Sequence, residues 1–203
     1  MIRIGVELNH VVRDVNRQIA KYYAKANGKE FDSDEFDSGV DVFENYARFE
    51  EKMDKHDFLY IDYPYEVFGC APVMDKGLAV RITTWLKELE NIEDDEVQVF
   101  FYSLDEGELT IQSTYFFLSK IGTRVRKIIF PKDARELINE CDVIVSARRE
   151  IFESDDFKGL TKVLIRRKFN EKCENYADYA YDTLTDFIND GEFVTKLLEE
   201  DKD

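Results

Sequence analysis

MIRIGVELNHVVRDV, residues 1–15, is the segment from which the fold of this chain is predicted. It opens with Ile2 to Val6, a short run rich in β-branched residues, which is typical of a buried strand. Polar residues follow this run directly, with Glu7 and Asn9 two positions apart. The segment therefore has the outline of a core strand that ends in an active-site loop, and we expect it to be such a strand rather than a signal peptide.

Further elements are predicted from the spacing of apolar residues along the rest of the chain. Strands are expected over residues 2–6, 97–102, 127–130, 142–145 and 162–166. Helices are expected over 14–27, 114–121 and from Tyr176 to near Gly191. Strands that alternate with helices favour a parallel sheet, so we predict an α/β fold with three layers. Residues 1–15 and 75–203 would form this Rossmann-like core, and residues 16–74 a small, acidic helical cap inserted after the first strand.

Four segments carry a resemblance to a known superfamily. Glu7 to Val11, ELNHV, stands where the haloacid dehalogenase (HAD) superfamily, and especially its deoxyribonucleotidase branch, reads DxDGV. Ser103 follows the strand-like run VQVFFY, where the family places a Ser or Thr that binds the transferring phosphoryl group. CDVIVSARREI, residues 141–151, resembles the family strand that ends in two aspartates, and KVLIRRKFN, residues 162–170, resembles its last strand. The segments occur in the family's order, so the resemblance implies a HAD-like core.

The resemblance also implies that the reactive residues are replaced. In the family the first aspartate attacks phosphorus and binds magnesium, and the second transfers protons. Glu7 keeps the charge but is longer by roughly 1.5 Å, and a displacement of about 1 Å can cost about a hundredfold in rate. Asn9 has no proton to transfer. Ser146 and Ala147 stand in place of the acids that anchor magnesium, so a metal site and a catalytic set are not expected.

An anion site is a weaker expectation from the same resemblance. Lys132 and Arg135 lie near the position of a family lysine that neutralises phosphate charge, although neither is in register with it. Ser103, Lys132, Arg135 and Arg148 could hold an anion without reacting it. The basic run Arg166 to Lys168 could line the same pocket, although such residues are more often ordinary surface charges.

Loss of the nucleophile, the proton carrier and the metal anchors leads us to expect a catalytically inactive HAD-like protein. In this interpretation the chain is not an enzyme, needs no cofactor and serves as a structural or interaction module. Two alternatives stay open. The first is a divergent phosphatase or 5'-nucleotidase that uses Glu7, with Mg²⁺ as its cofactor. The second is a protein that binds phosphate or a nucleotide without hydrolysing it.

Composition limits the partners and the compartment. The 203 residues carry a net charge of −16, which disfavours direct binding of nucleic acid. No apolar run reaches the roughly 18 residues that a membrane span needs. Three widely spaced cysteines suit reduced thiols in a cytoplasmic setting. We therefore expect other protein subunits as partners, and the Ile-, Lys- and Asp-rich, Pro-poor composition suggests a bacteriophage virion as one such assembly.

Overall fold

The fold is built on one six-stranded sheet in which every pairing is parallel. The computed structural model describes residues 1–33, 53–90, 97–104, 108–123 and 125–193. The strand order is β3-β2-β1-β4-β5-β6, which places β1 near the middle of the sheet, between β2 and β4. The strands are β1 (Ile2–Glu7), β2 (Val97–Tyr102), β3 (Ile128–Ile129), β4 (Val143–Ser146), β5 (Thr161–Ile165) and β6 (Tyr179–Tyr181).

The predicted strands are present. The structure adds β6, which lies in a segment whose apolar spacing predicts a helix. Tyr176 to Phe187 carries apolar residues at helical spacing, but the segment divides into β6 and the short helix α7 (Leu184–Asn189). Tyr179 pairs with Val163 and Tyr181 with Ile165, so this stretch forms a strand at the edge of the sheet. Pairing with β5 therefore overrides the local helical pattern.

α1 (Val15–Ala26) begins and ends where local signals place it, whereas α5 (Glu108–Ile121) begins before the predicted start at residue 114. Asp14 caps α1, because its carboxylate accepts a hydrogen bond from the Arg17 N–H. Gly28 follows the helix with a φ of 64°, a left-handed conformation that favours glycine. The remaining helical elements are α3 (Lys55–Asp57), the π-helical turns η1 (Phe58–Asp62) and η2 (Tyr65–Gly69), α4 (Leu78–Glu90), α6 (Arg149–Glu153), and the 3-10 turns η4 (Ala134–Asn139), η5 (Asp155–Phe157) and η6 (Lys168–Tyr176).

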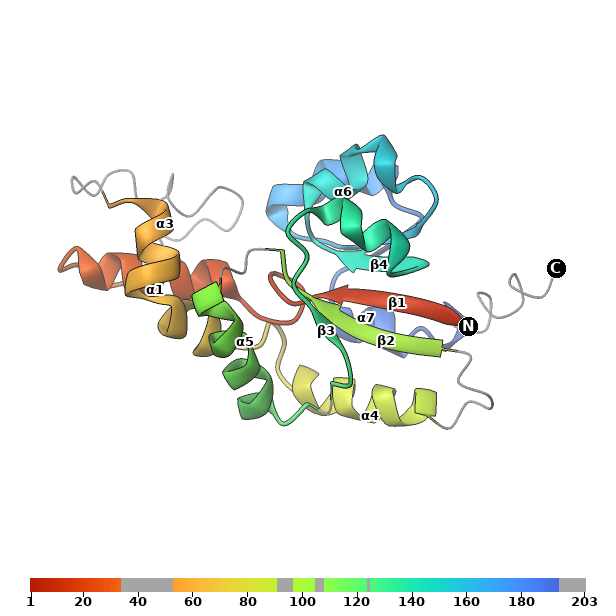
Figure 1. Ribbon diagram of the computed structural model, residues 1–203, viewed down its shortest axis with the longest axis horizontal. Helices are drawn as coiled ribbons and strands as arrows, with labels where there is room; N and C mark the ends of the chain where they lie inside the picture. The colour runs from red at the N-terminus through yellow and green to blue at the C-terminus, as the bar shows by residue number, and fades with distance from the viewer. Residues whose placement is uncertain (34–52, 91–96, 105–107, 124, 194–203) are drawn as a thin grey trace.

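The two faces of the sheet have separate cores, which confirms the predicted three-layer α/β fold. Side chains alternate along each strand, so Val99 and Phe101 of β2 face one layer and Phe100 and Tyr102 face the other. α4 and α7 cover the first face. α6 and the 3-10 turns cover the second face (Figure 1). Within the described residues, none of the helices combines the length and the apolar character that a membrane span requires.

A third cluster of buried residues forms a helical unit beyond the carboxyl end of β1 (Figure 1). α1 packs there against η1 and η2, with Tyr23 edge-on to Phe58 at a ring distance of 5.6 Å. This unit occupies the place of the predicted cap. The cap boundaries at residues 16 and 74 stay a prediction, and residues 34–52 of the cap lie outside the described residues.

Candidate functional site

The carboxyl ends of the central strands bring three of the predicted site residues to one edge of the sheet. Glu7 lies beside Tyr102 in the register of β1 and β2, so Ser103 is the next residue along. On the other side Val6 lies beside Val145, and Ser146 comes next. The strand order reverses at this point, and in α/β proteins the crevice at such a switch point is the usual ligand site.

Glu7 is fully buried and has hydrogen-bond donors at both carboxylate oxygens. Ser146 Oγ donates to Oε2 at 2.7 Å, and the Ala147 N–H donates to the same oxygen at 3.1 Å. Arg148 Nε donates to Oε1 at 2.5 Å and forms an ion pair. The Arg148 N–H in turn donates to Ser146 Oγ at 3.0 Å, which fixes that hydroxyl. The loop after β4 thus surrounds the carboxylate with donors and one positive charge.

Burial is the dominant influence on the protonation of Glu7. Desolvation raises the pKa of the Glu7 carboxyl, and the Arg148 charge and the hydrogen bonds from Ser146, Arg148 and Ala147 oppose that rise. The pKa of the neighbouring Tyr102 hydroxyl is raised as well, first by burial and then by the charge of Glu7. We therefore expect Tyr102 to stay neutral, with its hydroxyl 3.4 Å from the Val145 carbonyl to which it donates.

Asn9 lies on the other side of the cluster and is also fully buried. Its amide nitrogen donates to Ser103 Oγ at 3.2 Å, and its amide oxygen accepts from Arg13 Nε at 2.7 Å. Because Arg13 can only donate, this contact fixes which end of the amide faces Ser103. Asn9 can therefore orient the Ser103 hydroxyl, but it offers no proton for transfer.

Arg13 is a residue of the site that sequence reasoning missed. It is fully buried and joins the loop after β1 to the helical unit and to α5. Its Nη1 donates to the Phe68 carbonyl at 3.0 Å and to Thr114 Oγ1 at 2.8 Å. The guanidinium carbon also lies over the rings of Phe68 and Phe117, at 5.3 and 5.5 Å from their centroids. The signal in the sequence that could have identified Arg13 is its position four residues after Asn9 within an apolar segment.

Asn170 is a second buried polar residue that supports the site. Its amide nitrogen donates to the Ala147 carbonyl at 2.8 Å and to the Ile165 carbonyl at 3.0 Å. It therefore ties the loop after β4 to the end of β5. The resemblance of KVLIRRKFN to the last family strand included this asparagine, but only the structure shows what it holds.

Two of the predicted anion-binding residues take part in other contacts. Arg135 is exposed and forms an ion pair with Asp133, which caps η4. Lys132 is exposed, and its backbone N–H donates to Glu136. These contacts belong to the start of η4 and not to the Glu7 cluster. Ser103 and Arg148 are the members of the predicted anion site whose described contacts reach Asn9 and Glu7.

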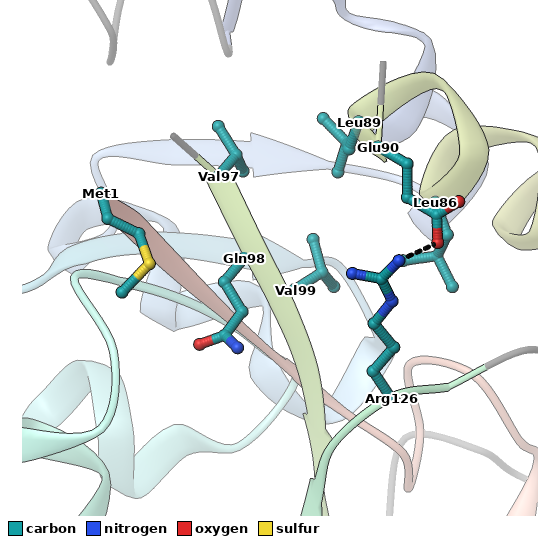
Figure 2. Close-up of a pocket in the computed structure, with 8 residues that line it drawn as sticks. All are labelled: Met1, Leu86, Leu89, Glu90, Val97, Gln98, Val99 and Arg126. Atoms are coloured by element: carbon teal, nitrogen blue, oxygen red, sulfur yellow. Dashed lines mark ion pairs between the residues drawn. The ribbon is translucent and has the colours of Figure 1, made fainter. Parts of the chain in front are cut away.

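A cavity of about 190 Å³ lies at the opposite end of the central strands. Figure 2 shows it between Met1, Val97 and Val99, with the Arg126–Glu90 ion pair at one side. Its position at the amino ends of β1 and β2 separates it from Glu7, which ends β1. We assign it no catalytic role.

Comparisons with solved structures identify the architecture. A HAD-superfamily hydrolase of subfamily IA from Geobacter sulfurreducens PCA aligns with a TM-score of 0.55 at 12% identity, over 93% of this chain and 95% of its own. A haloacid dehalogenase-like hydrolase from Burkholderia xenovorans LB400 aligns with a TM-score of 0.53 at 13% identity, over 95% and 98%. The chain has the HAD fold. No protein-family model and no curated protein matches the sequence.

A third structure with the HAD fold has a ligand bound covalently. It is the L-2-haloacid dehalogenase from Xanthobacter autotrophicus with chloropropionic acid covalently bound, with a TM-score of 0.51 at 9% identity, over 93% of this chain and 97% of its own. These comparisons correct the expectation of a catalytically inactive structural module, because proteins that share the fold over nearly their whole length are hydrolases and dehalogenases. The interpretation as a non-enzyme is therefore abandoned. The expectation rested on the residue types at positions 7 and 9, whereas the structure shows a buried carboxylate with ordered donors at the switch point.

Proposed function

We propose that the chain is a hydrolase of phosphate monoesters, related to the nucleotidase branch of the HAD fold, in which the Glu7 carboxylate is the nucleophile. The observation that carries this proposal is the position of Glu7 at the carboxyl end of β1, with both oxygens oriented by donors from the loop after β4. A nucleophile must be held in a defined direction, and such positioning is a main source of rate in phosphoryl transfer.

Each neighbouring group has a role in the proposed reaction. One Glu7 oxygen attacks phosphorus and displaces the alcohol oxygen, which leaves an acyl phosphate on Glu7. Water then attacks the phosphorus of this intermediate and breaks its bond to the Glu7 oxygen, which releases phosphate and restores the carboxylate. The proton lost by water passes through solvent to the alkoxide or phenolate released in the first step. Arg148 would turn from Glu7 towards the phosphoryl oxygens, and Ser103 Oγ would donate to one of them. Ser146 and the Ala147 N–H would keep the second Glu7 oxygen in place.

The side chains around Glu7 do not fit a magnesium ion. Magnesium prefers several oxygen ligands, often carboxylates and water. Ser146 and Ala147 stand where the family resemblance places two acids, and a guanidinium already neutralises Glu7 at 2.5 Å. We infer that Arg148 supplies the positive charge for the reaction, so the proposal involves no step through a metal.

The absence of a proton donor at Asn9 has a consequence for the substrate. An alcohol leaves as a strongly basic alkoxide unless it receives a proton, whereas a nitrophenolate leaves readily without one. We therefore expect faster turnover of p-nitrophenyl phosphate than of nucleoside monophosphates. The same reasoning makes 2-chloropropionate a useful further substrate, because chloride also leaves without a proton.

The proposal is tested by steady-state assays of the full chain on these three classes of substrate, with and without EDTA. Turnover of p-nitrophenyl phosphate should survive EDTA and be lost in Glu7→Gln. Glu153→Gln is the matched control, because it removes an exposed carboxylate that pairs with Arg149. If Glu7→Gln is as active as the wild type, Glu7 is not the nucleophile. If the chain turns over 2-chloropropionate and none of the phosphate esters, Glu7 would still be the nucleophile, but the substrate would be a haloacid and not a phosphate monoester.

A second candidate function is binding of phosphate or a nucleotide without hydrolysis. It is favoured by the ion pair between Glu7 and Arg148, which occupies the nucleophile, and by the missing proton carrier at Asn9. Calorimetric titration with phosphate and nucleoside monophosphates would then give saturable binding, while the assays above give no product.

A further inference from the structure

A pocket of about 270 Å³ lies beside the Glu7 cluster but has its own set of residues. Its walls come from His10 in the loop after β1, from Asp14, Asn16 and Arg17 at the start of α1, and from Arg167 to Phe169 after β5. Three residues of extended chain span at most about 11 Å, so the backbone at His10 lies within that distance of Glu7. The pocket is therefore at the same switch-point edge of the sheet.

The charge of this pocket contrasts with that of the chain. The whole sequence has a net charge of −16, yet Arg17, Arg167 and Lys168 line the pocket with Asp14 as the acidic residue among its walls. Asp14 already accepts the capping hydrogen bond from the Arg17 N–H. A concave surface with a local excess of positive charge attracts small anions.

Arg167 provides an observation that points to a missing ligand group. Its Nε donates to the His10 carbonyl at 2.9 Å, and its Nη1 donates to the carbonyls of Arg166 and Asp182. Its Nη2 is buried and has no hydrogen-bond partner among the described residues. A buried donor without a partner is unfavourable, so an acceptor at this position would stabilise it.

Burial and the neighbouring carboxylates have opposite effects on the pKa of Arg167. Burial lowers its pKa, and the charges of Asp75 and Asp14 act in the opposite direction. Burial raises the pKa of Asp75, whose Oδ2 is also buried without a partner among the described residues. Among the described residues, neither carboxylate accepts a hydrogen bond from Nη2.

The remaining walls of the pocket are apolar. Phe169 lies edge-on to the His10 ring with centroids 5.5 Å apart, and Met74 also faces the pocket. The volume lies just below the roughly 300 Å³ at which pockets for drug-sized ligands begin. A ligand of this size with an oxyanion at one end and a small apolar body would match both kinds of wall.

We propose that this pocket is a binding site for a small organic oxyanion, separate from the Glu7 cluster. The oxyanion pairs with the Arg167 guanidinium, with Arg17 and Lys168 as the other cationic residues, and the apolar body lies against Phe169 and Met74. Phosphate and carboxylate share the required chemistry, so the probes are inorganic phosphate, phenyl phosphate and benzoate. The proposal holds whether or not Glu7 is a nucleophile.

Calorimetric titrations at constant ionic strength test this site. Binding of the preferred probe should weaken about tenfold or more in the double variant Arg17→Glu, Lys168→Glu, which reverses two exposed charges. Lys87→Glu with Lys158→Glu makes the same change in net charge at exposed positions outside the pocket and should leave affinity unchanged. The same titrations are run in Glu7→Gln, in which the proposed hydrolase cannot turn over phenyl phosphate, and the two double variants should have the same effects there.

Three results would overturn the proposal. The first is a wild-type chain that binds none of the probes. The second is equal weakening by the two double variants, which would make the effect one of net charge alone. The third is loss of binding in Glu7→Gln with normal binding in the pocket variant, which would place the anion in the Glu7 cluster and leave the proposed hydrolase intact. Comparison of phenyl phosphate with benzoate identifies which oxyanion the pocket prefers.

Discussion

Glu7 is a fully buried carboxyl group whose raised pKa affects folding as well as chemistry. A carboxyl group whose pKa is higher in the folded chain than in the unfolded chain binds its proton more tightly when folded. The stability that this proton provides is complete below the unfolded pKa of about 4.3 and is lost as pH rises through the folded value. Nucleophilic activity should rise over the same interval, because it requires the carboxylate.

The corresponding experiment compares urea unfolding of the wild-type chain and Glu7→Gln from pH 4 to pH 8. The free energy of unfolding of the wild type should fall relative to that of Glu7→Gln as pH rises, because glutamine has no proton to lose. A wild-type curve that rises relative to the variant would mean that Arg148 outweighs burial and depresses the pKa of Glu7.

The positions of several site residues could be predicted from sequence because they directly follow buried strands. Glu7, Ser103 and Ser146 each end or follow a strand, and parallel strands place such residues at one edge. The pairing of Glu7 with Arg148 could not be predicted, because it depends on the distance between two loops that are 141 residues apart in sequence. The expectation of a non-enzyme rested on residue types alone, without the geometry around Glu7.

Arg13 connects three elements, namely the loop after β1, η2 and α5. We expect Arg13→Met to lower the free energy of unfolding by about 2–4 kcal/mol, because it leaves several buried acceptors without their donor. Chemical denaturation measures this loss. Arg17→Met is a suitable control, since Arg17 is exposed on α1. A loss no larger than in this control would show that the three elements are held together by apolar packing alone.

Gly5 allows β1 to approach the second core layer closely. A Cβ atom at this position would lie 2.9 Å from the ring of Phe100, which is itself fully buried. Gly5→Ala should therefore destabilise the chain by about 1–3 kcal/mol through overpacking. Gly159→Ala is the control, because a Cβ atom there meets no other atom within 4 Å. Thermal unfolding of both variants makes the comparison, and equal melting temperatures would contradict the packing argument.

The edge of the sheet shows why sequence predicts some elements better than others. β1, β2 and β4 lie in the middle of the sheet and are predicted from their own apolar runs. β6 has three residues and pairs with β5 alone, so its state depends on a contact that local spacing does not contain. The expected protein partners depend on surfaces in the same way and stay a prediction.

The net charge of −16 should make the stability of the chain depend on salt in two separable ways. Self-repulsion is screened as the Debye length falls from about 30 Å at 0.01 M to about 3 Å at 1 M, so sodium chloride should raise the melting temperature. Phosphate at equal ionic strength should raise it further, because a ligand that binds only the folded chain stabilises it. That additional rise should disappear in the Arg17→Glu, Lys168→Glu variant, while the chloride effect remains. Differential scanning calorimetry measures the rise in melting temperature in chloride and in phosphate. If phosphate raises the melting temperature of the variant as much as that of the wild type, the effect comes from general exclusion of phosphate from the protein surface and not from binding in the pocket.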